Sequence, residues 1–205
     1  MNEIVTVIDI ETTGLDATTD HITEIAAIRA EVGPGGYIRE IGRFQTYVAL
    51  PPGVEIPEFI TELTGIKTED LRGAPDVACV RTSLRRFLIE STAIVHNAPF
   101  DLSFAPLPMF TLGFACTRAM SRLVDPDESA SLADVCQRYG VELNGHHRAM
   151  NDVEATLQLY AILREKAEVN GITYSNVVID SEERPLTYVP PGAIVRTITK
   201  TKEAV

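Results

Sequence analysis

Three short segments, far apart in the chain, carry the acidic residues best suited to chemistry. Asp9 and Glu11 stand two positions apart, Asp101 ends a His-Asn-Ala-Pro-Phe-Asp segment, and Asp152 follows a pair of histidines. Carboxylate oxygens are hard ligands that suit Mg²⁺ or Mn²⁺, and the set lacks the thiolates typical of many zinc sites. Carboxylates brought to one point also repel each other until cations neutralise them. The four acids together therefore predict a divalent metal centre.

Each segment on its own has a simpler interpretation. Asp9 and Glu11 could be solvated acids at an exposed strand end. Asp101 and Asp152 could each complement the dipole at a helix N-terminus, with Asn151 as the helix cap in the second case. The metal hypothesis therefore depends on a fold that brings the whole set together.

A run of apolar, β-branched residues, 4–10, leads into the first acids and predicts a central strand covered on both faces. Side chains alternate along a strand, so Asp9 and Glu11 should point to the same side as Val5 and Val7. Open α/β sheets bind ligands at the carboxyl ends of their strands. Both acids thus lie where such a site is expected.

Turn residues and hydrophobic periodicity predict the other elements. A Gly-Pro-Gly-Gly segment at 33–36 separates two β-prone stretches, which indicates a hairpin. The predicted strands are 22–30, 37–48 and 92–96, and the predicted helices are 57–63, 68–71, 76–89, 131–139 and 151–168. Strands and helices alternate, which predicts an α/β domain over residues 1–170.

Residues 171–205 differ in character from this domain. Three prolines and Gly192 interrupt two short β-prone pieces, 174–179 and 194–199. The β-branched, apolar composition of these pieces argues against a disordered tether. We expect a C-terminal appendage that either contacts a partner or nucleic acid, or packs on the domain's own surface.

Composition limits the class of protein. The chain has 205 residues, 45% of them hydrophobic and 23% charged, which excludes collagen-like, disulfide-framework and wholly disordered proteins. No apolar run approaches the roughly 18–20 residues of a membrane-spanning helix, and Glu3 stands where a signal peptide would carry basic residues. Cys79, Cys116 and Cys136 are expected to be small buried thiols. We therefore expect a cytoplasmic protein without membrane association.

The net charge restricts any nucleic-acid function. The 18 Lys and Arg residues against 29 Asp and Glu residues leave −11, the wrong sign for general attraction to phosphates. A nucleic-acid partner therefore requires local positive charge, which bound metal ions would supply.

The acidic segments occur in a recognisable order. Asp-Ile-Glu-Thr-Thr-Gly-Leu at 9–15, His-Asn-Ala-x-Phe-Asp at 96–101 and His-x-Ala-x-x-Asp at 147–152 resemble the three motifs of DnaQ-like DEDDh 3′-to-5′ exonucleases. This family includes proofreading subunits of replicative DNA polymerases. The resemblance covers about residues 4–168 and implies a ribonuclease H-like fold, a mixed five-stranded sheet with helices on both faces.

The resemblance implies a role for each motif residue. Asp9 would bridge two metal ions, and Asp101 would support the second of them. Glu11 and Asp152 would complete the site of the ion that activates water. His147, five positions before Asp152, would be the general base. Its neighbour His146 lies out of register, and we expect it to be a surface bystander.

The resemblance also implies contacts with substrate. Thr12 and Thr13 would meet the terminal 3′ hydroxyl through backbone amides, and Leu15 would act as an apolar wedge at the terminal bases. The residues expected to line the nucleotide pocket are Leu63, Thr64, Asn97 and Phe100. Apolar contacts with bases read no sequence, so cleavage should be largely sequence-independent.

The implied function is a 3′-to-5′ exonuclease that releases nucleoside monophosphates from single-stranded or frayed DNA ends, using two Mg²⁺ or Mn²⁺ ions. Proofreading or repair is the implied setting, with a DNA polymerase as a candidate partner. A ribonuclease that trims RNA or short oligonucleotides would share the motifs and differ only in contacts to the 2′-hydroxyl. An inactive exonuclease fold that serves as a binding module is the third hypothesis. For an active enzyme, we expect removal of residues 172–205 to leave cleavage of a short single strand nearly intact.

Overall fold

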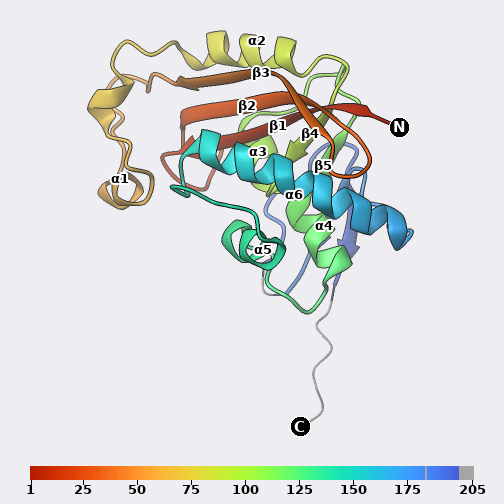
Figure 1. Ribbon diagram of the computed structural model, residues 1–205. Coiled ribbons are helices and arrows are strands. Elements are labelled where there is room, and N and C mark those ends of the chain that lie inside the picture. Colours follow the sequence, from red (N-terminus) through yellow and green to blue (C-terminus); the bar gives the residue numbers. More distant parts are fainter. Residues whose placement is uncertain (183, 199–205) are drawn as a thin grey trace.

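A five-stranded mixed sheet forms the centre of the fold (Figure 1). The computed structural model describes residues 1–182 and 184–198. The strands are β1 (Glu3–Thr12), β2 (Ile22–Val32), β3 (Ile38–Tyr47), β4 (Thr92–Val95) and β5 (Phe114–Cys116), in the order β3-β2-β1-β4-β5. β1 pairs antiparallel with β2 and parallel with β4, and β5 pairs parallel with β4. The predicted α/β class and mixed five-stranded sheet are confirmed.

Helices cover both faces of this sheet (Figure 1). One face packs against α4 (Thr117–Val124), α5 (Leu132–Tyr139) and the long α6 (Ala149–Val169). The other face packs against α2 (Val77–Phe87) and α3 (Ala98–Phe104). A small separate cluster joins α1 (Glu58–Thr64) to the 3₁₀ helix η1 (Thr68–Leu71). The central strands are therefore apolar on both sides, as their sequences indicated.

Alternation along β1 sets the position of the first acids. Val5 and Val7 are fully buried in the core on the α6 side of the sheet. Ile8 and Ile10 pack into the core on the opposite side. Asp9 and Glu11 lie an even number of positions from the two valines, so their side chains are on the same face of β1. They project toward the start of α6.

The β2–β3 hairpin turns through glycines. Gly35 and Gly36 both have φ +70°, a left-handed conformation that strains residues with a side chain. The strands on either side end within two residues of the predicted bounds. The hairpin prediction is confirmed.

Two local predictions were wrong. α6 starts at Ala149, so Asn151 lies inside the helix, where its side chain donates to the carbonyl of Gly145 at 2.9 Å rather than capping. Cys116 and Cys136 are buried as expected, but Cys79 is exposed. The amphipathic α2 turns Val80 and Leu84 toward the core and leaves Cys79 on its solvent side.

Residues after α6 form a second, two-stranded parallel sheet from β6 (Val177–Asp180) and β7 (Ile194–Thr197). Val177 and Val178 are fully buried beside α4 and β5. The C-terminal segment therefore packs on the domain's own surface. Its removal would expose apolar core, so the expectation that cleavage survives its deletion does not fit this packing. Thr199, the predicted end of the second strand, lies outside the described residues.

None of the helices in the described ranges has the length and apolar character that a membrane span requires.

Candidate active site

A pocket of about 310 Å³ lies at the carboxyl end of β1. Asp9, Glu11 and Asp152 each place a carboxylate oxygen there, and these oxygens lie within 4.8 Å of one another. Asp152 belongs to the first turn of α6. Asp101, buried in α3, lines the same pocket without joining this tight group. The fold thus brings together acids from three distant segments.

Burial and mutual repulsion both act on these acids. Burial is the main cause that raises the pKa of Asp9 well above its usual value, and the charges of Asp101 and Glu11 add to it. Burial, then the charges of Asp152 and Glu24, raise the pKa of Glu11 to about 8. Burial likewise raises the pKa of Asp101 to about 8. A cluster this acidic is costly without bound cations, and its all-oxygen donor set fits Mg²⁺ or Mn²⁺.

This crowding predicts how the metal-free protein responds to pH. Glu11 and Asp101 hold protons in the folded state up to about pH 8, whereas unfolding returns their pKa values to 4.5 and 3.8. Because the folded state binds more protons between these limits, the free energy of unfolding falls as the pH rises from about 5 to about 8. In EDTA, we expect Asp101→Asn to raise the melting temperature at about pH 8 by about 3 °C or more, the equivalent of about 1 kcal/mol in a domain of this size.

Melting followed by circular dichroism would measure this effect, with Asp127→Asn as the control because Asp127 is an exposed acid outside the pocket. The increase in melting temperature for Asp101→Asn should be smaller at about pH 5, and also smaller when Mn²⁺ is added. An equal gain at both pH values would contradict the electrostatic explanation.

Glu24 of β2 is a buried acid that the sequence analysis did not identify. Its side chain is 1% exposed. Its carboxylate accepts hydrogen bonds from the guanidinium of Arg148 at 3.2 and 3.3 Å, from the backbone N–H of Ala149 at 3.2 Å and from Gln45 at 2.9 Å. Glu24 therefore supplies the N-terminal cap of α6 from a neighbouring strand.

The Glu24–Arg148 pair ties the loop that carries His147 to the sheet. Glu24 lies opposite Glu11 in the β1–β2 register, and the charge of Arg148 lowers the pKa of Glu11. The available signal was an acid, Glu24, near the start of β2, between Thr23 and Ile25 in a stretch of otherwise uncharged residues. Its partner could not be inferred, since Arg148 is 124 residues away in sequence.

The two histidines of the third motif lie stacked at the pocket, with ring centroids 3.8 Å apart. His146 is exposed, as expected for a surface residue, but its Nδ1 contacts Asp152 at 2.9 Å, so it is not a bystander to the pocket. His147 donates its backbone N–H to Asp152 at 3.1 Å and has φ +67°. Burial, then the charge of His146, lowers the pKa of His147. Both rings are therefore placed to act on groups near Asp152.

His96 of the second motif has a structural role. Its Nε2 donates to the carbonyl of Ala130 at 3.2 Å, which leaves Nδ1 to accept from the hydroxyl of Thr117 at 3.0 Å. Burial lowers the pKa of His96 to about 3, so the ring stays neutral. This histidine links the end of β4 to α4 and to the loop before α5.

Most of the predicted substrate residues reach the pocket. Those that line it are Thr12, Leu15, Leu63, Thr64, Asn97 and Phe100. Leu15 is 83% exposed, which suits a residue that meets a ligand rather than the core. Leu63 is also exposed, at 49%.

The structure does not bring Thr13 into the pocket. Its backbone N–H donates to the carbonyl of His21 at 2.8 Å, and its hydroxyl donates to Asp20 at 3.2 Å. Both groups of Thr13 therefore hold the loop after β1 in place. Two cations at the pocket, Arg118 and Arg184, were not predicted as site residues.

Known proteins resemble this chain over most of its length. The model of the exonuclease family RNase_T matches residues 6–160. DNA polymerase III of the PolC type from Bacillus subtilis (strain 168) is 33% identical over 181 residues, which covers 84% of this chain and 12% of the polymerase. The PolC-type polymerase of Streptococcus suis (strain 98HAH33) is 33% identical over 179 residues, which covers 83% of this chain and 12% of that polymerase. The chain thus spans a small part of these relatives.

Solved structures agree on the fold. E. coli exonuclease I in complex with a dT13 oligonucleotide has a TM-score of 0.69 at 16% identity, over 82% of this chain and 42% of that chain. Exonuclease X in complex with 5′ overhanging duplex DNA has a TM-score of 0.63 at 23% identity, over 83% of this chain and 95% of that chain. These neighbours share the ribonuclease H-like fold. The motifs, the carboxylate pocket and the family match over residues 6–160 agree. The chain therefore belongs to the DnaQ-like exonuclease family of nucleases.

Proposed function

We propose that this chain is a metal-dependent 3′-to-5′ exonuclease that releases nucleoside monophosphates from single-stranded or frayed DNA ends. The observation that carries this proposal is the convergence of Asp9, Glu11 and Asp152 within 4.8 Å in a pocket flanked by exposed apolar side chains. Such a pocket combines hard ligands for a cation with a surface for a base.

Each acid has a place in the proposed mechanism. Asp9, Glu11 and Asp152 would hold one Mg²⁺ or Mn²⁺ ion, and Asp9 with Asp101 would hold a second. When bound, two such ions stabilise the charge on the attacking and the leaving oxygens of an in-line displacement at phosphorus.

The proton of the attacking water is assigned to His147. A ring nitrogen would accept this proton while the water oxygen bonds to phosphorus and the bond from phosphorus to the 3′ oxygen breaks. The lowered pKa of His147 keeps the ring neutral near pH 7, which is the form that accepts a proton. Asp152, held by the backbone N–H of His147, keeps the loop close to the carboxylates.

The proteins that resemble this chain support the assignment of DNA as the substrate. Its relatives at 33% identity are DNA polymerases, and its structural neighbours are described in complex with DNA. We infer a cytoplasmic role in proofreading or repair, in association with a DNA polymerase.

Cleavage of 5′-end-labelled oligonucleotides in Mg²⁺ or Mn²⁺ tests this function. Single-stranded DNA should shorten from its 3′ end to a ladder of products, and a primer with a mismatched 3′ end should shorten faster than a fully paired one. EDTA should stop the reaction.

The same assay separates the alternatives. Faster cleavage of RNA than of DNA of the same sequence would support a ribonuclease instead. Binding of DNA without cleavage in either metal would leave only the binding module.

A further inference from the structure

A second cavity, of about 610 Å³, adjoins the carboxylate pocket. The two cavities share five lining residues, which are Leu15, Asn97, Phe100, Arg118 and Arg184. They therefore form one continuous depression, with the acids at one end.

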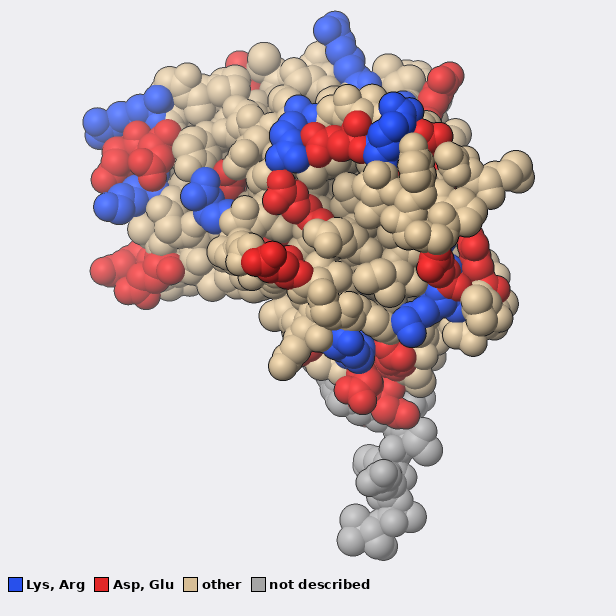
Figure 2. Space-filling view, viewed as in Figure 1, with Lys and Arg blue, Asp and Glu red and all other residues tan. Residues whose placement is uncertain are grey.

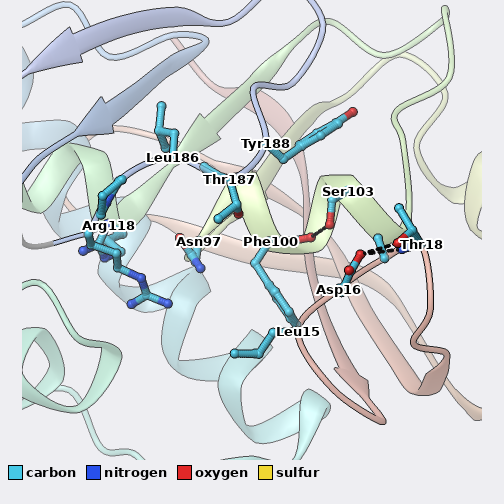
Figure 3. Close-up of a pocket in the computed structure, with 14 residues that line it drawn as sticks. Leu15, Asp16, Thr18, Asn97, Phe100, Ser103, Arg118, Leu186, Thr187 and Tyr188 are labelled. Carbon is cyan, nitrogen blue, oxygen red and sulfur yellow. Dashed lines mark hydrogen bonds between the residues drawn. The ribbon is translucent and has the colours of Figure 1, made fainter.

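Four parts of the chain line this second cavity, namely the loop after β1, α3 with its N-cap, Arg118 of α4 and the C-terminal segment (Figure 3). Leu15, Asp16 and Thr18, from the loop after β1, lie on one side of α3. Residues 186–188 of the C-terminal segment lie on the other side, and Phe100 projects from α3 toward Leu15. The segment outside the matched family region thus forms one wall.

Hydrogen bonds hold this wall in place. The carboxylate of Asp180, at the end of β6, accepts the backbone N–H of Leu186 at 3.0 Å. The backbone N–H of Arg184 donates to the carbonyl of Ser181 at 3.1 Å. β6 itself is anchored by fully buried valines. The wall is therefore preformed, which lowers the entropic cost of binding a ligand against it.

The charge of the second cavity differs from that of the chain. Its lining holds two cations, Arg118 and Arg184, and one acid, Asp16, for a balance of 2 − 1 = +1, whereas the chain carries −11. On the face in Figure 2, Lys and Arg side chains lie interspersed with Asp and Glu rather than gathered into one patch. Arg184 is exposed, and its guanidinium makes no hydrogen bond or ion pair within the described ranges. It is therefore available to bind an anion.

The apolar part of the lining suits nucleobases. Phe100, Leu186 and Tyr188 are partly buried side chains that reach the cavity from two of its walls. Aromatic and apolar surfaces beside a cation are the combination that binds single-stranded nucleic acid without reading its sequence.

We propose that this cavity binds the nucleotides on the 5′ side of the cleaved phosphate of single-stranded DNA. Arg184 binds a backbone phosphate, and Tyr188 stacks on a base. The C-terminal segment is then part of the substrate path, which makes it a determinant of affinity for longer strands. This inference rests on the proposed exonuclease function, because it takes the acidic end of the depression as the point of cleavage.

Fluorescence anisotropy with an oligothymidylate of about eight nucleotides, in Ca²⁺ to slow cleavage, tests the role of Arg184. We expect Arg184→Ala to raise the dissociation constant about 3- to 10-fold and Arg184→Glu to raise it further. The slope of log affinity against log salt concentration should decrease by about 0.7, the value for one phosphate contact on a single strand. Arg196→Ala is the matched control, since Arg196 is exposed on β7 and lines neither cavity. This control should change neither quantity.

The aromatic contact is tested with the same oligonucleotide. Tyr188→Leu removes the ring and keeps apolar volume, and should weaken binding about tenfold. Tyr188→Phe keeps the ring and should bind like the wild type. Circular dichroism would establish that each variant is folded.

The outcomes separate the two proposals. Wild-type cleavage of DNA combined with unchanged binding by Arg184→Ala and Tyr188→Leu would overturn this inference and leave the exonuclease function standing. A wild-type protein that neither binds nor cuts single-stranded DNA would overturn both.

Discussion

Asp9→Ala is expected to abolish nuclease activity. Asp9 is the one acid assigned to both metal ions, and it lies within 4.8 Å of Glu11 and Asp152. Metal ions contribute several kcal/mol to the stabilisation of transition-state charge, and about 4 kcal/mol corresponds to about 10³-fold in rate. We therefore expect the rate on single-stranded DNA to fall by about 10³-fold or more. Calorimetry with Mn²⁺ should show weakened binding in the same variant.

The matched control for this variant is Asp127→Ala. Asp127 is an exposed acid in the loop between α4 and α5 and lines neither cavity. Its loss changes net charge by the same amount, so activity and Mn²⁺ binding should stay at wild-type levels. Full activity of highly purified Asp9→Ala protein would rule out the two-metal assignment.

The sequence was most informative where the chemistry is local. The β1 run, the glycine turn of the hairpin and the start of a helix at Ser131 depend on short-range preferences, and the structure has all of them. Alternation along β1 likewise predicted that Asp9 and Glu11 share a face. These rules concern residues within a few positions of each other, which one sequence displays directly.

Contacts between distant segments could not be predicted in this way. β5 and α4 are short, at 3 and 8 residues, and have no periodicity long enough to identify them. The cap of α6 comes from Glu24 on another strand, so the local choice of Asn151 was wrong. The wall formed by residues 184–188 also depends on tertiary packing, which composition alone does not reveal.

The distribution of charge explains how so acidic a chain could bind a polyanion. The acids that line the carboxylate pocket repel DNA only until divalent cations neutralise them. Next to them, the second cavity carries a small positive balance through Arg118 and Arg184. With ions bound at the proposed site, we expect attraction to be confined to the proposed substrate path, so binding should be selective for a strand end that reaches the ions rather than for any phosphate backbone.

The assignment of the general base rests on the spacing of the third motif, and the stacked rings make it open to test. Spacing selects His147, five positions before Asp152. Geometry places the Nδ1 of His146 on the Asp152 carboxylate at 2.9 Å, and Asp152 is one of the residues that we propose as metal ligands. We therefore expect His146 to affect metal affinity and His147 to affect proton transfer.

His147→Ala should lower turnover by about 10²- to 10⁴-fold, because general base catalysis contributes about this much. Binding of Mn²⁺ and of a single-stranded oligonucleotide should be largely kept, since only the proton acceptor is lost. Burial holds the pKa of His147 below its usual 6.5, so the acid limb of the wild-type rate profile should lie below about pH 6.5 and disappear in the variant. Added imidazole should restore part of the rate to His147→Ala, an effect that a purely structural role would not produce.

His146→Ala is the neighbouring control, with a turnover loss of less than about tenfold. If the two variants behave the other way round, the base is His146, and the geometry at Asp152 outweighs the spacing of the motif.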